Sequence, residues 1–272
     1  MTTAQHFKFR RRPTFGGVAF RILIAVLYLF LLAPLFIMVV LSFSSNQYIS
    51  FPPKGFTLEW YARLPSTYQF MDGLQTSLIT ASVATVVVLL LGVPVALAIS
   101  RFHFKGKAAI QAFFLSPLLV PTIVTALGLV LLLGPLGLTN TYFSIILGHA
   151  AITIPYVIRT TLISLQTSET SCEDAARVLG ASGLTVFRRI TLPIIAPGVI
   201  SGGVLAFIVS FDELVVSLFV AESGKPTLPV HIMRYVENSA DAVVAALSVI
   251  LILFSILIVV VVERLTGLRK SL

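Results

Sequence analysis

Charged residues are scarce in this chain: they make up 11% of its 272 residues, against about a quarter in an average soluble domain. Hydrophobic residues make up 57%, and the mean hydropathy is +1.00. The net charge of +8 does not indicate nucleic-acid binding, because the basic residues are scattered among apolar runs. The composition therefore places the chain in the membrane class, with the lipid bilayer as its surroundings.

Cysteine is nearly absent as well, and the single residue, Cys172, excludes an intrachain disulfide. The chain has no G-x-x-x-x-G-K-[ST] phosphate-binding sequence and no pattern of a nucleophile with its base. His103 and His231 show no metal-ligand spacing, and His149 is expected to form hydrogen bonds between helices. We therefore expect no catalytic residues, no metal ligands and no cofactor, and the chain is not expected to be an enzyme.

Long stretches without charge predict the membrane spans. A spanning helix needs about 20 apolar residues, and the charge-free stretches accommodate six such helices. The expected spans are about 18–43, 75–100, 109–133, 142–164, 194–220 and 242–262. The expected fold is all-α and polytopic, with a transmembrane domain over 18–264 between an N-terminal tail, 1–17, and a C-terminal tail, 265–272.

The distribution of basic residues predicts the orientation. With the N-terminus in the cytoplasm, the cytoplasmic segments hold fifteen of the 19 Lys and Arg residues. The external loops hold the other four, Lys54, Arg63, Lys225 and Arg234. Basic residues near span ends favour the cytoplasmic side. We therefore expect a multi-pass protein of the cell (inner) membrane, with both termini and the segment 168–193 in the cytoplasm.

The segment 168–193 is a polar interruption in the apolar second half of the chain. Ser171 is a candidate cap for a short helix, and Gly180 is a suitable C-terminal stop for it. Ser182 is a candidate cap for a second short helix. The physical pattern alone leaves two interpretations open: a surface helix that only touches lipid, and a docking site for a soluble protein.

The residue spacing in this segment is more specific. It resembles the EAA loop of the integral-membrane permeases of ATP-binding-cassette importers, in which Glu-Ala-Ala is followed by Gly, Ile and Leu-Pro at fixed intervals. The matching positions are Asp174, Ala175, Ala176, Gly180, Ile190, Leu192 and Pro193. Asp174 replaces the glutamate of the pattern, and Glu173 precedes it, so either carboxylate can supply the charge. The resemblance implies that these eight residues couple an ATPase to a type I importer permease fold.

The resemblance also implies partners. Two cytoplasmic ATP-binding subunits would drive two permease subunits, and an external or periplasmic solute-binding protein would deliver the solute. The second permease is expected to be a different chain, with a homodimer as the alternative. This chain would form half of the translocation pathway, and ATP would be hydrolysed by a separate subunit.

The fifth expected span carries two acids in the run AFIVSFDELVVSLFV. Acids inside a span usually face a cavity or a partner, so Ser210, Asp212 and Glu213 are candidate substrate-pathway residues. Helical periodicity places Ser210 and Glu213 on one stripe of small and polar residues, which favours Glu213 as the cavity residue. Asp212 would need a partner or a break in the helix. The alternative is that the stripe only packs helices together.

Nearly the whole chain resembles the spermidine/putrescine branch of this family, most distinctively in its Ser-Phe-Asp-Glu run. The resemblance implies a polyamine as the solute, and carboxylates are suited to replace the lost hydration of its ammonium groups. The alternatives are the same importer class with iron, thiamine, an opine or another organic solute. A self-contained secondary transporter or channel, and a membrane scaffold without a pathway, would leave the segment 168–193 unexplained.

Overall fold

The computed structural model describes residues 15–66, 68–221, 224–239 and 241–266. Within these residues every regular element is a helix, and β-pairing is confined to two isolated bridges. In chain order the elements are α1 (Phe15–Ser42), α2 (Glu59–Arg63), η1 (Leu64–Ser66), α3 (Tyr68–Arg101), α4 (Lys107–Leu115), η2 (Ser116–Leu118), α5 (Thr122–Leu133), α6 (Tyr142–Thr167), α7 (Ser171–Val178), α8 (Gly183–Val186), η3 (Phe187–Thr191), α9 (Leu192–Phe211), α10 (Val215–Val220), α11 (Leu228–Asn238) and α12 (Val243–Thr266).

Most of the two expected tails lies outside the described residues. This holds for 1–14 of the N-terminal tail and for 267–272 of the C-terminal tail. The parts of the tails that are described continue the neighbouring helices, since α1 begins at Phe15 and α12 ends at Thr266.

Among the described residues, five helical segments are each long and apolar enough to cross a membrane, and each overlaps an expected span. They are Ala19–Ser42, Gln69–Arg101, Tyr142–Thr167, Gly183–Phe211 and Val243–Val261. The all-α, polytopic fold expected from the composition is therefore confirmed. Helices suit this environment because their backbone hydrogen bonds are made within the segment, where hydrocarbon offers none.

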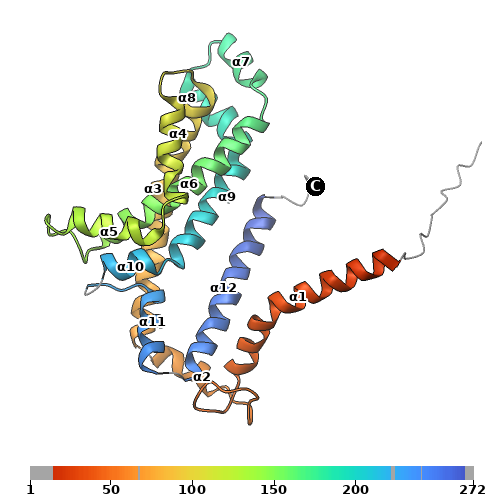
Figure 1. The fold of residues 1–272 in the computed structure, drawn as a ribbon. Helices are drawn as coiled ribbons and strands as arrows, with labels where there is room; N and C mark the ends of the chain where they lie inside the picture. The colour runs from red at the N-terminus through yellow and green to blue at the C-terminus, as the bar shows by residue number, and fades with distance from the viewer. Residues whose placement is uncertain (1–14, 67, 222–223, 240, 267–272) are drawn as a thin grey trace, which may run out of the picture.

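The third expected span, 109–133, is not one straight helix. The chain forms one helical stretch over Lys107–Leu118 and a second over Thr122–Leu133, bent by 104° from the first. Prolines cause the break: Pro117 and Pro121 cannot donate a backbone hydrogen bond, and Pro121 has the non-helical dihedrals φ −54° and ψ 134°. As a result α5 runs across the molecule while α4 runs along it (Figure 1).

Helices α3, α6 and α9 pack together at the centre of the molecule (Figure 1). Their shared cluster of buried side chains includes Val88, Ala96, Val157, Ile158, Ile195 and Ala206. Two glycines let α9 approach α6 closely: a Cβ at Gly198 would lie 2.8 Å from Thr160 O, and one at Gly202 would lie 2.9 Å from Val157 Cα. Small residues allow such close helix contacts inside membranes, where dispersion rather than the hydrophobic effect drives packing.

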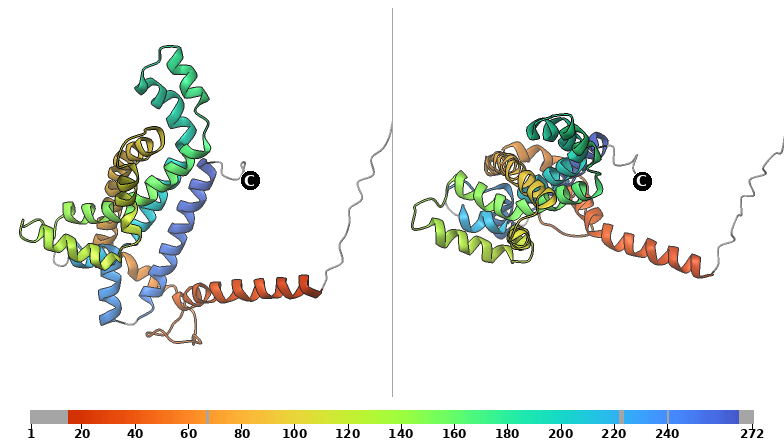
Figure 2. Two further views of the ribbon diagram at one scale, coloured as in Figure 1. Left: turned by 45° about the horizontal axis from the view of Figure 1, so that its top comes forward. Right: turned by 90° about the horizontal axis from the view of Figure 1, so that it is seen from above.

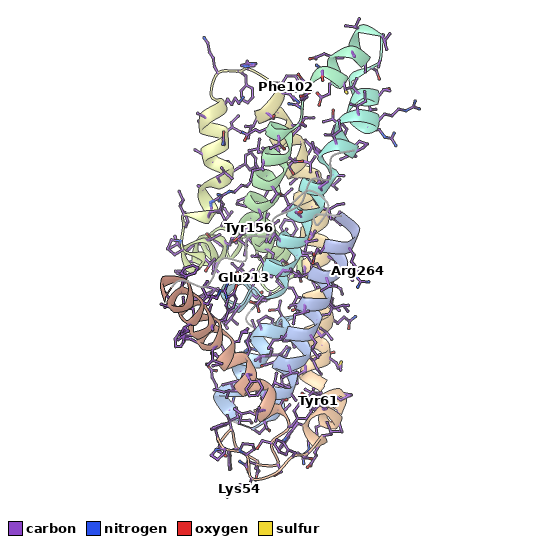
Figure 3. All side chains as sticks on the ribbon, turned by 90° about the vertical axis from the view of Figure 1, so that its right-hand side faces the viewer. Lys54, Tyr61, Phe102, Tyr156, Glu213 and Arg264 are labelled. Carbon is purple, nitrogen blue, oxygen red and sulfur yellow. The ribbon has the colours of Figure 1, made fainter. Side chains whose placement is uncertain are left out.

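The molecule has two distinct ends (Figure 1). Helices α7 and α8 form one of them, named here the α7 end, and α2 and α11 lie at the other, the α11 end. In the side view, Phe102 lies near the α7 end, Lys54 at the α11 end and Glu213 about midway (Figure 3). Helix α1 packs against α12 and otherwise projects away from the body (Figure 2).

Candidate functional site

The segment 168–193 forms the α7 end of the molecule and links α6 to α9 (Figure 1). Its eight predicted coupling residues differ in exposure. Glu173 is buried; Ala176, Ile190 and Leu192 are half-buried; Asp174, Ala175, Gly180 and Pro193 are exposed. The predicted set is therefore divided between residues that face solvent and residues that hold the segment against the membrane helices.

Helix α7 ends where the sequence predicts. Gly180 has φ +85°, a left-handed conformation that favours glycine. Its N–H donates to Arg177 O at 3.0 Å, and the Ala181 N–H donates to Ala176 O at 3.0 Å. These two bonds form a Schellman motif, which satisfies carbonyl groups at the helix end. The expected stop at Gly180 is confirmed.

The two serine caps expected in this segment have different outcomes. Ser182 caps α8, because its hydroxyl accepts from the Thr185 N–H at 3.3 Å. At the start of α7 the N-cap is Thr170 rather than Ser171, and no side chain caps it. The Ser171 hydroxyl instead lies 3.4 Å from a carboxylate oxygen of Glu169.

Glu173 and Asp174 are adjacent but face opposite surroundings. Glu173 Oε1 accepts from Nη2 of Arg101 at 2.9 Å, and the glutamate side chain is only 4% exposed. The Asp174 side chain is 60% exposed, and its Oδ1 lies 3.3 Å from Nη1 of the exposed Arg177. Successive residues of a helix point about 100° apart, which separates the two carboxylates. The outward negative charge is therefore that of Asp174.

Three apolar side chains stand out at the tip of this end. Val178 and Leu179 are each 88% exposed, and Leu184 is 67% exposed. Apolar groups presented to water on a structured, polar segment are typical of an interaction site. The eight coupling residues expected from the sequence do not include these three. The available signal was an apolar pair placed directly before the Gly180 stop.

The second half of the segment is continuous with a membrane helix. Helix α8 passes through a π-helical turn, η3, directly into α9. Together they form the 29-residue helix Gly183–Phe211, which is about 43 Å long at 1.5 Å per residue. Pro193 lies inside this helix, just after the π-helical turn, and cannot donate a backbone hydrogen bond there. The segment 168–193 is thus joined to Phe211 by one continuous helix.

The fifth expected span, 194–220, breaks at the two acids. Helix α9 ends at Phe211, α10 begins at Val215, and residues 212–214 form the break. Glu213 turns back to its own chain: its Oε1 accepts from the Val216 N–H at 3.0 Å. The periodicity that favoured Glu213 as the cavity residue assumed a continuous helix, and the break removes that basis.

A buried histidine holds both sides of this break. His149 of α6 has Nδ1 at 2.8 Å from Ser210 Oγ and Nε2 at 2.8 Å from Ser217 Oγ. A neutral imidazole donates from one nitrogen and accepts at the other, so each serine hydroxyl has a compatible role. The expectation of helix-to-helix hydrogen bonding by His149 is confirmed. Ser210, a predicted pathway residue, is 2% exposed and serves in this contact.

The carboxylate of Asp212 has no hydrogen-bond or ion-pair partner among the residues that the structure describes, and it lines two cavities. One, of about 430 Å³, lies between α9, α12 and Leu35 of α1. The other, of about 570 Å³, lies between the break and α11. Three phenylalanines surround the first cavity, Phe207, Phe211 and Phe254, with neighbouring ring centroids 6.0 and 5.4 Å apart.

Metal ligands do not gather anywhere in the described ranges. No group of three or more His, Cys, Asp or Glu side chains there is arranged to hold a metal ion. His103 follows α3 at the α7 end, whereas His231 belongs to α11 at the opposite end. The chemistry available at the break is that of one free carboxylate beside aromatic rings.

Comparison with known proteins gives consistent matches. The family described as binding-protein-dependent transport system inner membrane component matches residues 88–268. The chain is 33% identical over 246 residues to the spermidine/putrescine transport system permease protein PotC of Haemophilus influenzae, covering 90% of this chain and 95% of the relative. It is 32% identical over 240 residues to the putrescine transport system permease protein PotI of Escherichia coli, covering 85% of each.

A solved structure shares the fold. One chain of a bacterial ABC transporter involved in the import of the acidic polysaccharide alginate matches with a TM-score of 0.73 at 20% identity, over 96% of this chain and 99% of that one. The family match covers α3 from residue 88 onward, all of α6 and α9, the segment 168–193 and the break at Asp212. The chain therefore belongs to the binding-protein-dependent transport system inner membrane components, the permease subunits of ATP-binding-cassette importers.

Proposed function

We propose that this chain forms half of the pathway of an ATP-driven importer for a polyamine such as putrescine or spermidine. A second permease, expected to be a different chain, supplies the other half. Two cytoplasmic ATP-binding subunits supply the energy, and an external solute-binding protein delivers the solute. The names of the relatives PotC and PotI support the substrate class, and the geometry at Asp212 supports it independently.

The observation that carries the substrate class is the free carboxylate of Asp212 beside three phenylalanine rings. Inside a membrane an ammonium group loses its hydration and needs a negative or aromatic substitute. Asp212 supplies the charge, and the faces of Phe207, Phe211 and Phe254 supply cation–π surface. The Glu213 carboxylate accepts the Val216 N–H, so Asp212 is the residue that contacts the cation directly.

The α7 end is proposed to lie in the cytoplasm, with both chain termini on the same side. The described residues of that end include the basic residues Arg101, Arg177, Arg188 and Arg189. The α11 end has fewer basic residues, as the positive-inside rule requires of an external face. In this orientation Val178, Leu179 and Leu184 point toward the ATP-binding subunit.

The proposed mechanism is a mechanical connection. An ATP-binding subunit grips the exposed apolar tip and the outward carboxylate of Asp174, and it moves α7 and α8. Because α8, η3 and α9 are one continuous helix, the movement reaches Phe211 and the break at Asp212. His149 ties both sides of the break to α6, so the rearrangement there follows α6 and α9 together. The carboxylate is thereby presented to one side of the membrane or to the other.

The function is tested by uptake and by co-purification. Cells lacking the gene for this chain should lose energy-dependent uptake of labelled putrescine or spermidine, and the wild-type gene should restore it. The tagged chain should purify with an ATP-binding subunit, and Leu179→Asp should abolish that association. Leu58→Asp is the control, since Leu58 is 66% exposed outside the tip. Unchanged polyamine uptake in the deletion strain contradicts the substrate, and purification without any ATP-binding subunit contradicts the importer assembly.

A further inference from the structure

Arg101 and Glu173 join two parts of the molecule that are far apart in the sequence. Arg101 is the last residue of α3, and Glu173 lies in the first turn of α7, 72 residues later. Arg101 Nη2 and Glu173 Oε1 are 2.9 Å apart, and the two side chains are 14% and 4% exposed. Glu173 is the only carboxylate buried within the described part of the chain. A carboxylate withdrawn from water needs a hydrogen-bonded partner of opposite charge, and Arg101 is that partner.

The same guanidinium also binds the end of α6. Arg101 Nη1 donates to Leu165 O at 3.3 Å, and Nη2 donates to Ser168 Oγ at 3.1 Å. Leu165 belongs to the last turn of α6, and Ser168 begins the link to α7. The planar fork of arginine suits several acceptors at once, which the point charge of lysine does not. One side chain of α3 thus binds α6, the link and α7.

The other cation near Glu173 has a different character. Arg177 Nη2 lies 3.9 Å from Glu173 Oε2, but the Arg177 side chain is 54% exposed and also contacts Asp174. Exposed ion pairs of this kind contribute little because water screens them. The restraint on Glu173 therefore comes from Arg101.

This pair adds a third connection between α7 and the membrane helices. The backbone already joins α7 to α6 on one side and, through α8, to α9 on the other. Neither connection reaches α3, which packs against α6 and α9 in the core. We infer that Arg101 and Glu173 are positioning residues that lock the orientation of α7 to α3, so that a partner that moves α7 moves α3 with α6 and α9. The inference rests on the proposed function, in which an ATP-binding subunit moves α7.

The first test needs only the full chain in detergent. Cys172 is the single cysteine, is exposed and precedes Glu173, so a nitroxide attached to it reports the motion of α7. The double variant Arg101→Gln/Glu173→Gln removes the lock and leaves no unpaired buried charge, which protects the fold. We expect faster nitroxide motion in this variant and in Glu173→Gln. Glu59→Gln is the matched control, because it breaks the exposed pair with Arg63. An unchanged spectrum in the double variant overturns the inference.

The second test separates positioning from assembly. The complete importer is reconstituted in liposomes, and labelled putrescine taken up is divided by ATP hydrolysed. In the double variant we expect the ATP-binding subunits to remain bound and hydrolysis to continue. Putrescine transported per ATP should fall by about fivefold or more, as for the loss of a typical coupling free energy. The same ratio should fall in Arg101→Lys, because a lysine ammonium cannot donate to all three acceptors of the arginine fork.

Three outcomes of this second test overturn the inference. One is a parallel fall in uptake and hydrolysis, which means that the pair only supports assembly. Another is a normal ratio in the double variant with a low ratio in Glu173→Gln, which traces the defect to the unpaired Arg101. The last is a wild-type ratio in every variant. A wild-type complex that transports no putrescine contradicts the proposed function itself, so the two failures are distinguishable.

Discussion

Gly148 of α6 and Val216 of α10 lie so close that a Cβ at position 148 would come within 2.5 Å of the valine Cγ1. This contact and the hydrogen bond between His149 and Ser217 hold α10 against α6. We expect Gly148→Ala to destabilise the protein by about 1–3 kcal/mol, as overpacking does, and to lower the midpoint of thermal unfolding in detergent. Gly128→Ala in α5 is the control, because its Cβ would meet no described atom within 4 Å. Equal midpoints of thermal unfolding for the two variants would contradict close packing of α6 against Val216.

His149 should couple energetically to both serines across the break. We expect Ser217→Ala in the wild-type background to cost about 1 kcal/mol, and His149→Phe to cost about 1–3 kcal/mol because it strands buried hydroxyls. In the His149→Phe background, Ser217→Ala should cost much less, since its partner is already absent. Thermal unfolding of the four proteins in this cycle measures the coupling. Additive effects would show that the 2.8 Å contact carries no stability.

Asp212 and Glu213 should respond differently to loss of charge. Asp212→Asn removes the free carboxylate, so we expect uptake of labelled putrescine to fall by about tenfold or more, the equivalent of 1.4 kcal/mol or more. Glu213→Gln keeps an oxygen that accepts from the Val216 N–H, so uptake should stay within about twofold of wild type. Neither variant should change the amount of protein in the membrane. The reverse order of effects would return the role to Glu213.

Gly180 should tolerate a side chain less well than its neighbour Gly183. Alanine at position 180 must adopt the left-handed φ of +85°, at a cost of about 1–2 kcal/mol. We expect Gly180→Ala to weaken co-purification with the ATP-binding subunit and to reduce uptake. Gly183→Ala is the matched control, because Gly183 lies in the same segment, has space for a Cβ and is helical. Equal association for both variants contradicts a role for the left-handed turn.

The stability of the α11 end should depend on pH through His231. This residue lines a cavity of about 350 Å³ with Asp72 and Lys225. Burial lowers the pKa of His231, Arg234 lowers it further, and Asp72 opposes them. As the pH falls, His231 therefore takes up its proton at a higher pH in the unfolded chain than in the folded protein. The contribution of the neutral histidine to the free energy of unfolding is present above the ordinary pKa near 6.5 and is lost as the pH falls below it.

The measurement for His231 is the thermal midpoint between about pH 5 and 8. Relative to His231→Gln, the wild-type protein should lose stability as the pH falls through this range. His103→Gln, which changes an exposed histidine beyond the end of α3, controls for general effects of histidine replacement. Parallel pH profiles for wild type and His231→Gln rule out the titration of this residue as the cause.

Local features of the segment 168–193 were predictable because their causes are local. Gly180 ends α7 through its own backbone conformation, and Ser182 caps α8 through a bond to a residue three positions away. The spacing from Asp174 to Pro193 likewise identified the family before any geometry was available. The inward turn of Glu173 was not predictable, since its partner Arg101 lies 72 residues away.

For Asp212 the sequence left two alternatives open, a partner or a break in the helix, and could not decide between them. Apart from the two acids, residues 194–220 form an apolar run of the length of one helix, and no proline marks residues 212–214. The contacts that hold the break come from α6: Gly148 admits Val216, and His149 bonds Ser210 and Ser217. The stripe of small and polar residues that was expected to line a cavity is thus used largely for helix packing, and Asp212 is the acid that lines the cavities.

The sequence by itself determined that this chain resides in a membrane, that its fold is all-α and polytopic, and which family it belongs to. These properties depend on amino-acid composition, on the length of the apolar runs and on the spacing of the motif residues, and each of these is a property of the linear chain. The tertiary structure decided which acid is free, which carboxylate of the segment 168–193 faces outward, and how α7 is tied to α3. Those properties depend on side chains brought together across 61 to 72 residues, because a buried polar group takes its orientation from its partner rather than from its neighbours in sequence.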